Sequence, residues 1–153
     1  MIIRPATEKD IEAIRQLFWE LDTDAIKHQP EHFQRGDRND ESLIEMINGP
    51  KSQFLLAELQ DEVVGFSLLF EKETNGPSLL IPCRYAYMQD FIVKEIHRNC
   101  GIGTRLFEAS KQWAKDRGLD YLRLSVFPSN HSGIRFYKRH GLQEQMVSME
   151  CHL

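Results

Sequence analysis

Several features that would assign the chain to a special class are scarce or missing. Lysine and arginine number 19 against 23 acidic residues, so the net charge is -4 and no basic excess points to nucleic acid. No apolar run is long enough to span a bilayer, and residues 1–5 lack the apolar core of a signal peptide. The three cysteines, Cys83, Cys100 and Cys151, have no metal-ligand spacing. These absences predict a cytoplasmic protein with reduced thiols and no nucleic-acid or membrane partner.

The composition is that of a folded domain. Hydrophobic residues make up 41% of the chain and charged residues 27%, which excludes a disordered or low-complexity protein. The 153 residues contain no internal repeat and no linker rich in glycine and serine. We therefore expect a single domain over residues 1–153.

Hydrophobic periodicity predicts alternating strands and helices. After a short strand at residues 2–4, a capping box at Thr7 starts a helix whose apolar stripe ends at Leu21. The pattern fades over residues 22–40, where we expect a loop with a broken helix. The remaining elements expected are a helix at 40–47, strands at 54–59, 63–70 and 84–93, a helix at 102–118, a strand at 121–126, a helix at 130–141 and closing strands over 142–153. This order predicts an α/β fold.

A glycine-rich loop follows the strand at 84–93 and opens directly into a helix. It reads Arg98-Asn99-Cys100-Gly101-Ile102-Gly103-Thr104. The first turn of a helix has unpaired N–H groups and partial positive charge, and glycine lets a phosphate approach the backbone closely. Arg98 can add a charged contact. The alternative is a tight turn that needs glycine only for its conformation; the two glycines alone favour this turn, and only the neighbouring motifs change that.

The residues of this loop exclude two common phosphate-binding motifs. The nucleotide P-loop requires a lysine directly after its second glycine, whereas Thr104 and Arg105 follow Gly103. The dinucleotide fingerprint requires a third glycine at the position of Leu106. A nucleotide-phosphate-binding enzyme is therefore disfavoured.

Two motifs stand in order along the second half of the chain. The first is the strand end at 90–93 followed by Arg-x-x-Gly-x-Gly at 98–103, and the second is Asn-x-x-Gly-x-x-Phe-Tyr at 130–137, followed by Gly141-Leu142. Together they resemble the GNAT superfamily of acetyl-CoA-dependent N-acetyltransferases over essentially the whole chain. The resemblance implies a GNAT fold, in which a mixed, mostly antiparallel central sheet has a splayed parallel pair of strands and helices on both faces.

The resemblance also implies roles for individual residues. The strand edge at Phe91, Ile92 and Val93 would pair with the pantetheine arm of acetyl-CoA and stabilise an oxyanion, and Asn130 would contact the same arm. Tyr137 would protonate the departing thiolate. A β-bulge near Asp90 would splay the strand from its neighbour. Backbone N–H groups would hold the CoA pyrophosphate along the loop residues Arg98, Asn99, Cys100, Gly101, Ile102, Gly103 and Thr104.

The general base is the least determined part of this site. Some ribosomal-protein alanine acetyltransferases of the superfamily have a glutamate five residues before the asparagine, but Ser125 stands there and cannot hold the proton at neutral pH. Asp90 is the candidate base; it is a solvated strand-end acid if the register slips by one residue. Tyr137 has the alternative of a core residue, but its spacing from Asn130 favours the catalytic role. We read Cys100 as a loop filler rather than a nucleophile.

Two features of the region before residue 42 have alternative readings. The segment 28–32, His-Gln-Pro-Glu-His, matches a zinc-protease spacing. Pro30 disfavours the helix that would align both histidines, so we expect no metal site. Residues 20–41 contain seven acids against three lysines or arginines. They either line an acceptor site that attracts a cationic amine or form a solvated surface.

The expected function is therefore transfer of an acetyl group from acetyl-CoA directly to a primary amine, without a metal. The alternative is a catalytically silent CoA-binding sensor or regulatory module, which the serine at position 125 favours. The acceptor, a small-molecule or a protein amine, is left open by the sequence, as are the length of the acyl group and the pairing of the chain as a homodimer.

Overall fold

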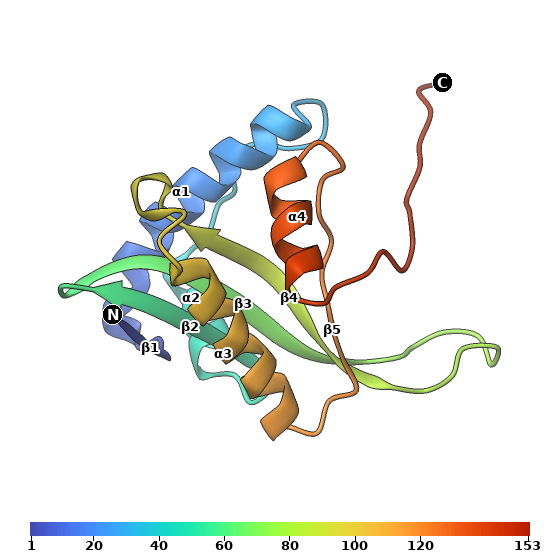
Figure 1. Cartoon of the computed structure of the whole chain (residues 1–153), viewed down its shortest axis with the longest axis horizontal. Coiled ribbons are helices and arrows are strands. Elements are labelled where there is room, and N and C mark those ends of the chain that lie inside the picture. Colours follow the sequence, from blue (N-terminus) through green and yellow to red (C-terminus); the bar gives the residue numbers. More distant parts are fainter.

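The computed structural model describes residues 1–153 and contains one five-stranded sheet (Figure 1). The strands are β1 (Ile2–Pro5), β2 (Ser52–Leu59), β3 (Glu62–Glu73), β4 (Arg84–Val93) and β5 (Tyr121–Arg123). They lie side by side in the order of the sequence. The first four pair antiparallel, and β4 and β5 pair parallel. This confirms the expected mixed, mostly antiparallel sheet with one parallel pair.

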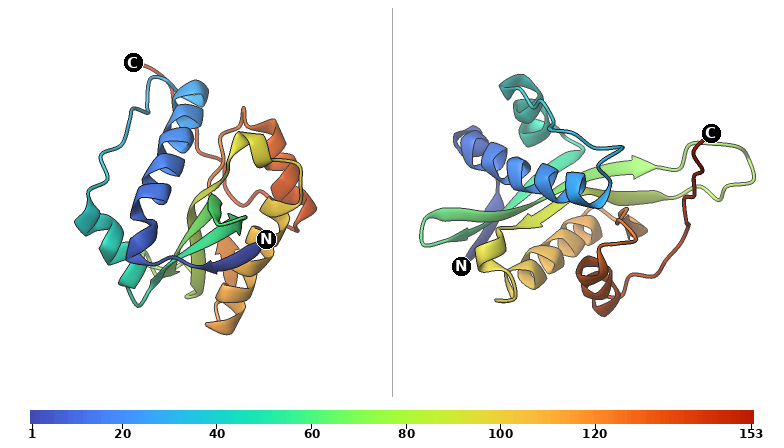
Figure 2. Two further views of the ribbon diagram at one scale, coloured as in Figure 1. Left: turned by 90° about the vertical axis from the view of Figure 1, so that its left-hand side faces the viewer. Right: turned by 90° about the horizontal axis from the view of Figure 1, so that it is seen from above.

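Helices cover both faces of the sheet (Figure 2). One face packs against α1 (Ile11–His28) and α2 (Asp40–Asn48), and the other against α3 (Ile102–Asp116) and α4 (His131–Arg139). Two short 3-10 turns, η1 (Glu8–Asp10) and η2 (Glu95–His97), precede α1 and α3. Each face has its own apolar cluster, so the sheet is buried from both sides as expected. None of the helices has both the length and the apolar character needed to cross a membrane.

The helix α1 is longer than its hydrophobic pattern predicts. The expectation of a loop from residue 22 is wrong for residues 22–28, which continue α1. The apolar stripe breaks because Asp22, four residues after the buried Phe18, is itself buried. Two hydrogen bonds of 2.8 Å from the guanidinium of Arg38 compensate its charge. A buried ion pair, which a hydropathy pattern does not reveal, therefore accompanies about two further turns of helix, to His28.

The parallel strands β4 and β5 separate soon after they begin to pair. Only Tyr85–Tyr87 of β4 align with Tyr121–Arg123 of β5. A bulge follows in β4, where Leu68 of β3 lies opposite Asp90 and Leu69 lies opposite Met88, so that Gln89 is the extra residue. A bulge bends its strand and increases the local twist. The strand expected over 121–126 ends at Arg123 because β4 no longer lies beside it.

The closing strands expected over residues 142–153 are absent, and this prediction is wrong. Leu142 packs against the cluster under α3, and its N–H donates to the carbonyl of Tyr137. Residues 143–153 are extended, exposed and without secondary structure. The segment has the alternating pattern of a strand, but a strand forms only when another strand pairs with its backbone. Within one chain it has no such partner.

Candidate functional site

The loop before α3 presents a continuous run of unpaired backbone donors. The N–H of Arg98 donates to the carbonyl of Glu95 at 3.2 Å, and the N–H of Arg105 donates to Gly101 at 3.2 Å. Between them, six consecutive N–H groups donate to no acceptor in the protein, those of Asn99, Cys100, Gly101, Ile102, Gly103 and Thr104. Left-handed backbone at Asn99 (φ 61°) and Gly101 (φ 81°) curls the loop, and the first turn of α3 has no acidic residue. Such a cradle at a helix N-terminus suits an anion.

The side chain of Arg98 braces this loop. Its Nε donates to the carbonyl of Val93 at 2.8 Å, and an Nη donates to the carboxylate of Asp24 on α1 at 3.2 Å. The thiol of Cys100 donates to the carbonyl of Arg98 at 3.4 Å. The guanidinium is thus committed to holding the loop between β4 and α1, and its backbone N–H is already bonded.

The two glycines of the loop have different surroundings. A Cβ on Gly101 would meet no atom within 4 Å, so only its positive φ restricts the side chain there. A Cβ on Gly103 would lie 3.5 Å from the ring of Phe136 and 3.9 Å from Val93. Gly103 therefore faces inward and allows α3 to approach α4 and the end of β4 closely.

The end of β4 beside this loop has an unpaired edge. Past Tyr87 no strand lies on the β5 side of β4, so the backbone of Phe91, Ile92 and Val93 is open along that edge. Ile92 and Val93 are buried and Phe91 is half-buried, which fixes the strand from its two faces. An open strand edge can accept an extended chain by backbone hydrogen bonding.

Tyr137 lies against this part of β4. Its ring centroid is 6.3 Å from that of Phe91 and 6.0 Å from that of Phe107, within an aromatic cluster that joins α3, α4 and β4. Burial alone raises the pKa of Tyr137 to about 12. The phenol is therefore neutral at physiological pH, and its proton is available to an incoming group.

Asn130 caps α4. Its Oδ1 accepts hydrogen bonds from the N–H of Gly133 at 3.0 Å and from the hydroxyl of Ser132 at 3.4 Å. An asparagine at this position satisfies the open N–H groups of a helix start. The cap uses the carbonyl oxygen and leaves the Nδ2 donors for another partner.

Asp90 points to the α1 face of the sheet. It lies opposite Leu68 and two residues before Ile92, and both of these pack in the cluster under α1 and α2. Burial raises the pKa of Asp90 to about 6, the positive charge of Arg38 opposes that rise, and the negative charge of Asp22 adds to it. The neighbouring Phe91 points to the opposite face, toward Tyr137. Asp90 and Tyr137 therefore lie on opposite faces of the sheet, both next to the open edge of β4.

The charges of the Asp22–Arg38 ion pair act on Asp90. This pair was not predicted from the sequence. Burial acts to raise the pKa of Asp22, but hydrogen bonds from Arg38 and from the N–H of Gly36 lower it overall. The guanidinium of Arg38 also lies 4.0 Å above the ring of Phe18. The sequence did contain a signal for this pair. Asp22 falls within the apolar stripe of a helix, and a buried acid at such a position needs a positively charged or hydrogen-bonding partner.

The remaining candidates lie apart from one another. Ser125 accepts a hydrogen bond from the hydroxyl of Tyr87 at 3.4 Å. His28, the last residue of α1, contacts the hydroxyl of Ser129 at 2.7 Å, whereas His32 in the following turn contacts Glu150 at 2.5 Å. The two histidines of the zinc-like spacing thus have separate partners.

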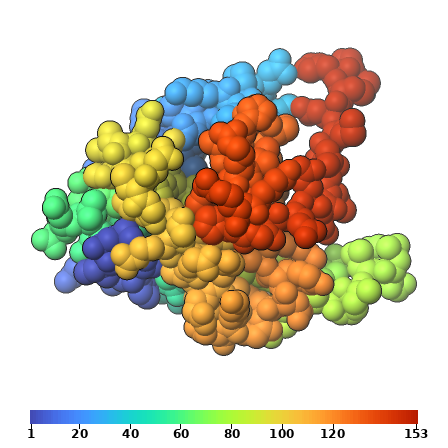
Figure 3. Space-filling model, in the orientation of Figure 1, coloured from blue at the N-terminus to red at the C-terminus, as the bar shows by residue number.

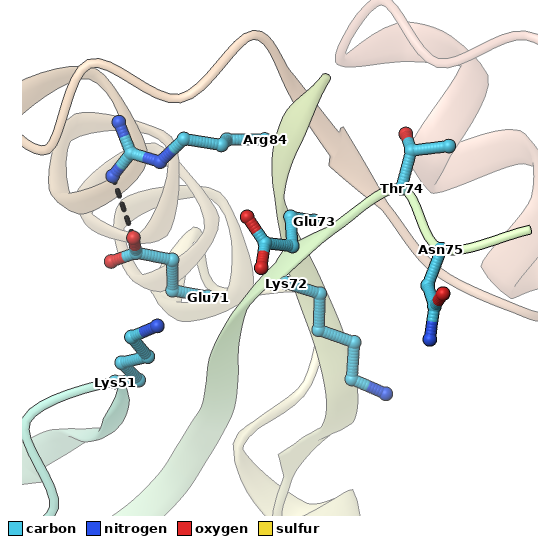
Figure 4. A pocket seen from close by; sticks show the side chains of 7 residues that line it. All are labelled: Lys51, Glu71, Lys72, Glu73, Thr74, Asn75 and Arg84. Carbon is cyan, nitrogen blue, oxygen red and sulfur yellow. Dashed lines mark hydrogen bonds and ion pairs between the residues drawn. The ribbon is translucent and has the colours of Figure 1, made fainter. Parts of the chain in front are cut away.

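A cavity of about 520 Å³ lies where the loop between β3 and β4 leaves the sheet (Figure 4). No hydrophobic residue lines it, and Glu71 within it pairs with Arg84 and Arg117. Lys72 points away from this pair, and its ammonium lies 4.6 Å from the ring of Tyr87. The cavity has no apolar wall and no run of free backbone N–H groups, so the loop and the strand edge remain the better candidate for the functional site.

Comparisons with known proteins point to one family. The model of the acetyltransferase (GNAT) family matches residues 11–142. A thialysine N-epsilon-acetyltransferase of Bos taurus is 34% identical over 82 residues, 54% of this chain and 45% of that protein. An uncharacterized N-acetyltransferase of Methanocaldococcus jannaschii is 32% identical over 94 residues, 61% of this chain and 40% of that protein. The chain thus spans less than half the length of these two curated relatives.

A solved structure matches over the full length of the chain. The tetramutant of the BH1408 protein of Bacillus halodurans superimposes with a TM-score of 0.93 and 26% identity, covering 100% of both chains. The whole fold, including the splayed strand pair, is therefore one that a solved protein adopts.

Proposed function

The chain belongs to the acetyltransferase (GNAT) family, and from this premise we propose that it transfers the acetyl group of acetyl-CoA directly to a primary amine. The observation that carries the proposal is the run of six unpaired N–H groups from Asn99 to Thr104 beside the open edge of β4. The first suits a pyrophosphate and the second an extended amide-containing arm. A nucleotide triphosphate site would need neither the strand edge nor a phenol.

Three parts of the chain would hold acetyl-CoA. The N–H groups of residues 99–104 would bind its pyrophosphate, and the edge of β4 at residues 91–93 would pair with the pantetheine arm. The free Nδ2 of Asn130 would donate to the same arm, since its Oδ1 already caps α4. Acetyl-CoA supplies an acetyl group activated as a thioester.

The protein's own groups then have three tasks. They remove a proton from the acceptor, stabilise the oxyanion and protonate the departing sulfur. Asp90 takes a proton from the acceptor ammonium, which frees the nitrogen lone pair for attack on the carbonyl carbon. A backbone N–H of β4 near Phe91 stabilises the oxyanion. As the C–N bond forms and the C–S bond breaks, Tyr137 donates its proton to the sulfur. The second proton, which the nitrogen loses as it becomes an amide, returns to the phenolate of Tyr137 through solvent. No step assigns a role to a metal ion.

The acceptor proposed is a cationic amine that enters on the α1 side of the sheet. Asp90 faces that side, and α1 with the segment after it is rich in carboxylates, which would attract a cationic amine. The relative named for thialysine supports a small-molecule amine over a protein amine. We propose that residues 1–153 act as one domain. All three cysteines are free, which supports a reducing compartment such as the cytoplasm.

The test is isothermal titration of the protein with acetyl-CoA, with ATP as the control ligand, followed by thiol release with a panel of amines. We expect acetyl-CoA to bind, ATP not to bind, and at least one small amine to release CoA. Binding without turnover on any amine would favour the silent CoA-binding module instead. Failure to bind acetyl-CoA would reject the proposal.

A matched pair of glycine variants separates binding from folding in the same titration. Gly101→Val and Gly118→Val both place a branched residue at positive φ, 81° and 67°, with no atom near the new Cβ. Both are expected to cost stability of about 1 kcal/mol or more. Only Gly101→Val should abolish acetyl-CoA binding, because it reorients the N–H groups at the start of α3, whereas Gly118 follows the far end of that helix. Equal loss in both variants would argue against the loop as the binding site.

A further inference from the structure

The α1 face of β4 is open in only one direction from Asp90. Toward the end of the strand the next residue on this face is Ile92, which is buried in the cluster under α1 and α2. In the other direction, past the bulge, it is the half-buried Tyr87, which lies opposite Phe70 of β3. The sheet there runs out beyond its helices, and the β3–β4 hairpin stands away from the body of the molecule (Figures 1 and 3). An amine held at Asp90 therefore has room for the rest of its chain only over Tyr87.

Two cations flank Tyr87 on this face, one from each neighbouring strand. Lys72 of β3 places its ammonium 4.6 Å from the centre of the Tyr87 ring. Arg123 is the residue of β5 that lies opposite Tyr87, and its guanidinium lies 4.5 Å from the centre of the Tyr85 ring. Stacking on tyrosine holds both charges over the face of the sheet without neutralising them.

Neither cation has an acidic partner in the chain. No carboxylate forms an ion pair with Lys72 or Arg123, whereas Arg84 at the start of β4 pairs with Glu71 at 2.6 Å. The guanidinium of Arg123 makes one hydrogen bond, which it donates to the Sγ of Cys83 at 3.9 Å. A guanidinium has five N–H donors, so most of those of Arg123 are free for a ligand. The two cations together suit an anionic group.

The separation of these cations from Asp90 limits the length of the acceptor. Tyr87 and Tyr85 precede Asp90 by three and five residues, and an extended strand rises about 3.3 Å per residue, so they lie at most roughly 10 and 16 Å from it. A hydrogen bond of about 3 Å at each end of the acceptor leaves roughly 4–10 Å between its amine and its anionic group. A short aliphatic chain spans this distance.

We propose that the acceptor is an aliphatic amine with a carboxylate at its far end, and that Lys72 and Arg123 select it by binding that carboxylate. The inference rests on the proposed function, because it assigns the acceptor of the same site. The ammonium would lie at Asp90, the aliphatic chain would cross the ring of Tyr87, and the carboxylate would lie between the two cations. A diamine would place its second ammonium against like charges and would be a poor acceptor.

The test compares three acceptors that share one amine and a six-carbon chain and differ at the far end. The far end is a carboxylate in ε-aminocaproate, a methyl group in hexylamine and a second amine in hexamethylenediamine. Thiol release at saturating acetyl-CoA gives kcat and KM for each. We expect kcat/KM to be about 10-fold higher for ε-aminocaproate than for hexylamine, and lowest for the diamine. The differences should lie in KM, because the far end does not touch the reacting atoms.

Four variants assign the preference to residues. Arg123→Gln should remove most of the advantage of ε-aminocaproate and leave hexylamine unchanged, and Arg123→Lys should restore part of it. Lys72→Glu, at an exposed position, should make the diamine a better acceptor than ε-aminocaproate. Lys115→Gln is the control, because it removes an equal charge from an exposed position on α3, on the opposite face of the sheet. It should leave the order of the three acceptors as it is in the wild type.

Three outcomes would overturn the inference. One is equal kcat/KM for the three acceptors, or a preference for the diamine, in the wild type. Another is an equal loss for all three acceptors in Arg123→Gln, which would make Arg123 a structural residue. The third is acetylation of other amines but of none of these three, and in all these cases amine acetylation itself stands. If no amine is acetylated at all, the proposed function fails and the inference fails with it.

Discussion

Replacing Tyr137 by phenylalanine is expected to lower kcat by about 100-fold, the usual scale for loss of a general acid. The phenol is neutral, because burial raises its pKa to about 12, and its ring lies against Phe91 at the open edge of β4. Phenylalanine keeps the aromatic packing and removes only the hydroxyl. The KM for acetyl-CoA should therefore change little, and steady-state thiol release at saturating amine would measure the effect.

The control for this variant is Tyr121→Phe. Tyr121 lies on β5 and is 56% exposed, so loss of its hydroxyl should leave kcat unchanged. Thermal unfolding should be the same for both variants, because each keeps its aromatic ring and loses only a hydroxyl. Wild-type turnover in Tyr137→Phe would make this residue part of the aromatic core alone.

The parts of the site that the sequence predicted are those built from neighbouring residues. The loop at 98–104 is determined by its own glycines and by the helix that follows, and its unpaired N–H groups are a property of any helix start. The strand at 84–93 was placed with its observed bounds because its pattern is long and bordered by breaks. Local chemistry was sufficient for both.

The parts that the sequence did not predict depend on distant partners. Asp22 interrupts an apolar stripe, and only Arg38, sixteen residues later, makes that position helical. The resemblance implied a bulge near Asp90, and the pairing of β4 with β3 confirms it; that pairing alone shows that Gln89 is the extra residue and so decides the face to which Asp90 points. The segment after Leu142 reads as a strand but needs an edge that is not offered to it within the chain. In each case the deciding contact lies outside the window in which periodicity is read.

Asp90→Asn is expected to lower kcat/KM for the amine by about 100-fold or more at pH 7 and to regain part of it as the pH rises. A lysine-like amine has a pKa near 10.4, so little of it is free at neutral pH without a base. In the wild type, kcat/KM should fall below pH 6, because the pKa of Asp90 is about 6 and only the carboxylate accepts a proton. The variant should lose this acidic limb. A response to pH like that of the wild type would reject Asp90 as the base.

Two arginine variants test whether the fall of kcat/KM below pH 6 comes from the titration of Asp90. Arg38 acts on Asp90 by its positive charge, which lowers the pKa of that carboxyl. Arg38→Met removes the charge and leaves Asp22 without its partner, and both changes raise the pKa of Asp90. The acidic limb should therefore move to higher pH. Arg35→Met is the control, because Arg35 comes from the same segment and lies 3.7 Å above the ring of Trp19 without acting on Asp90. A limb that stays near pH 6 in Arg38→Met would belong to another group, and the amine would then lose its proton elsewhere.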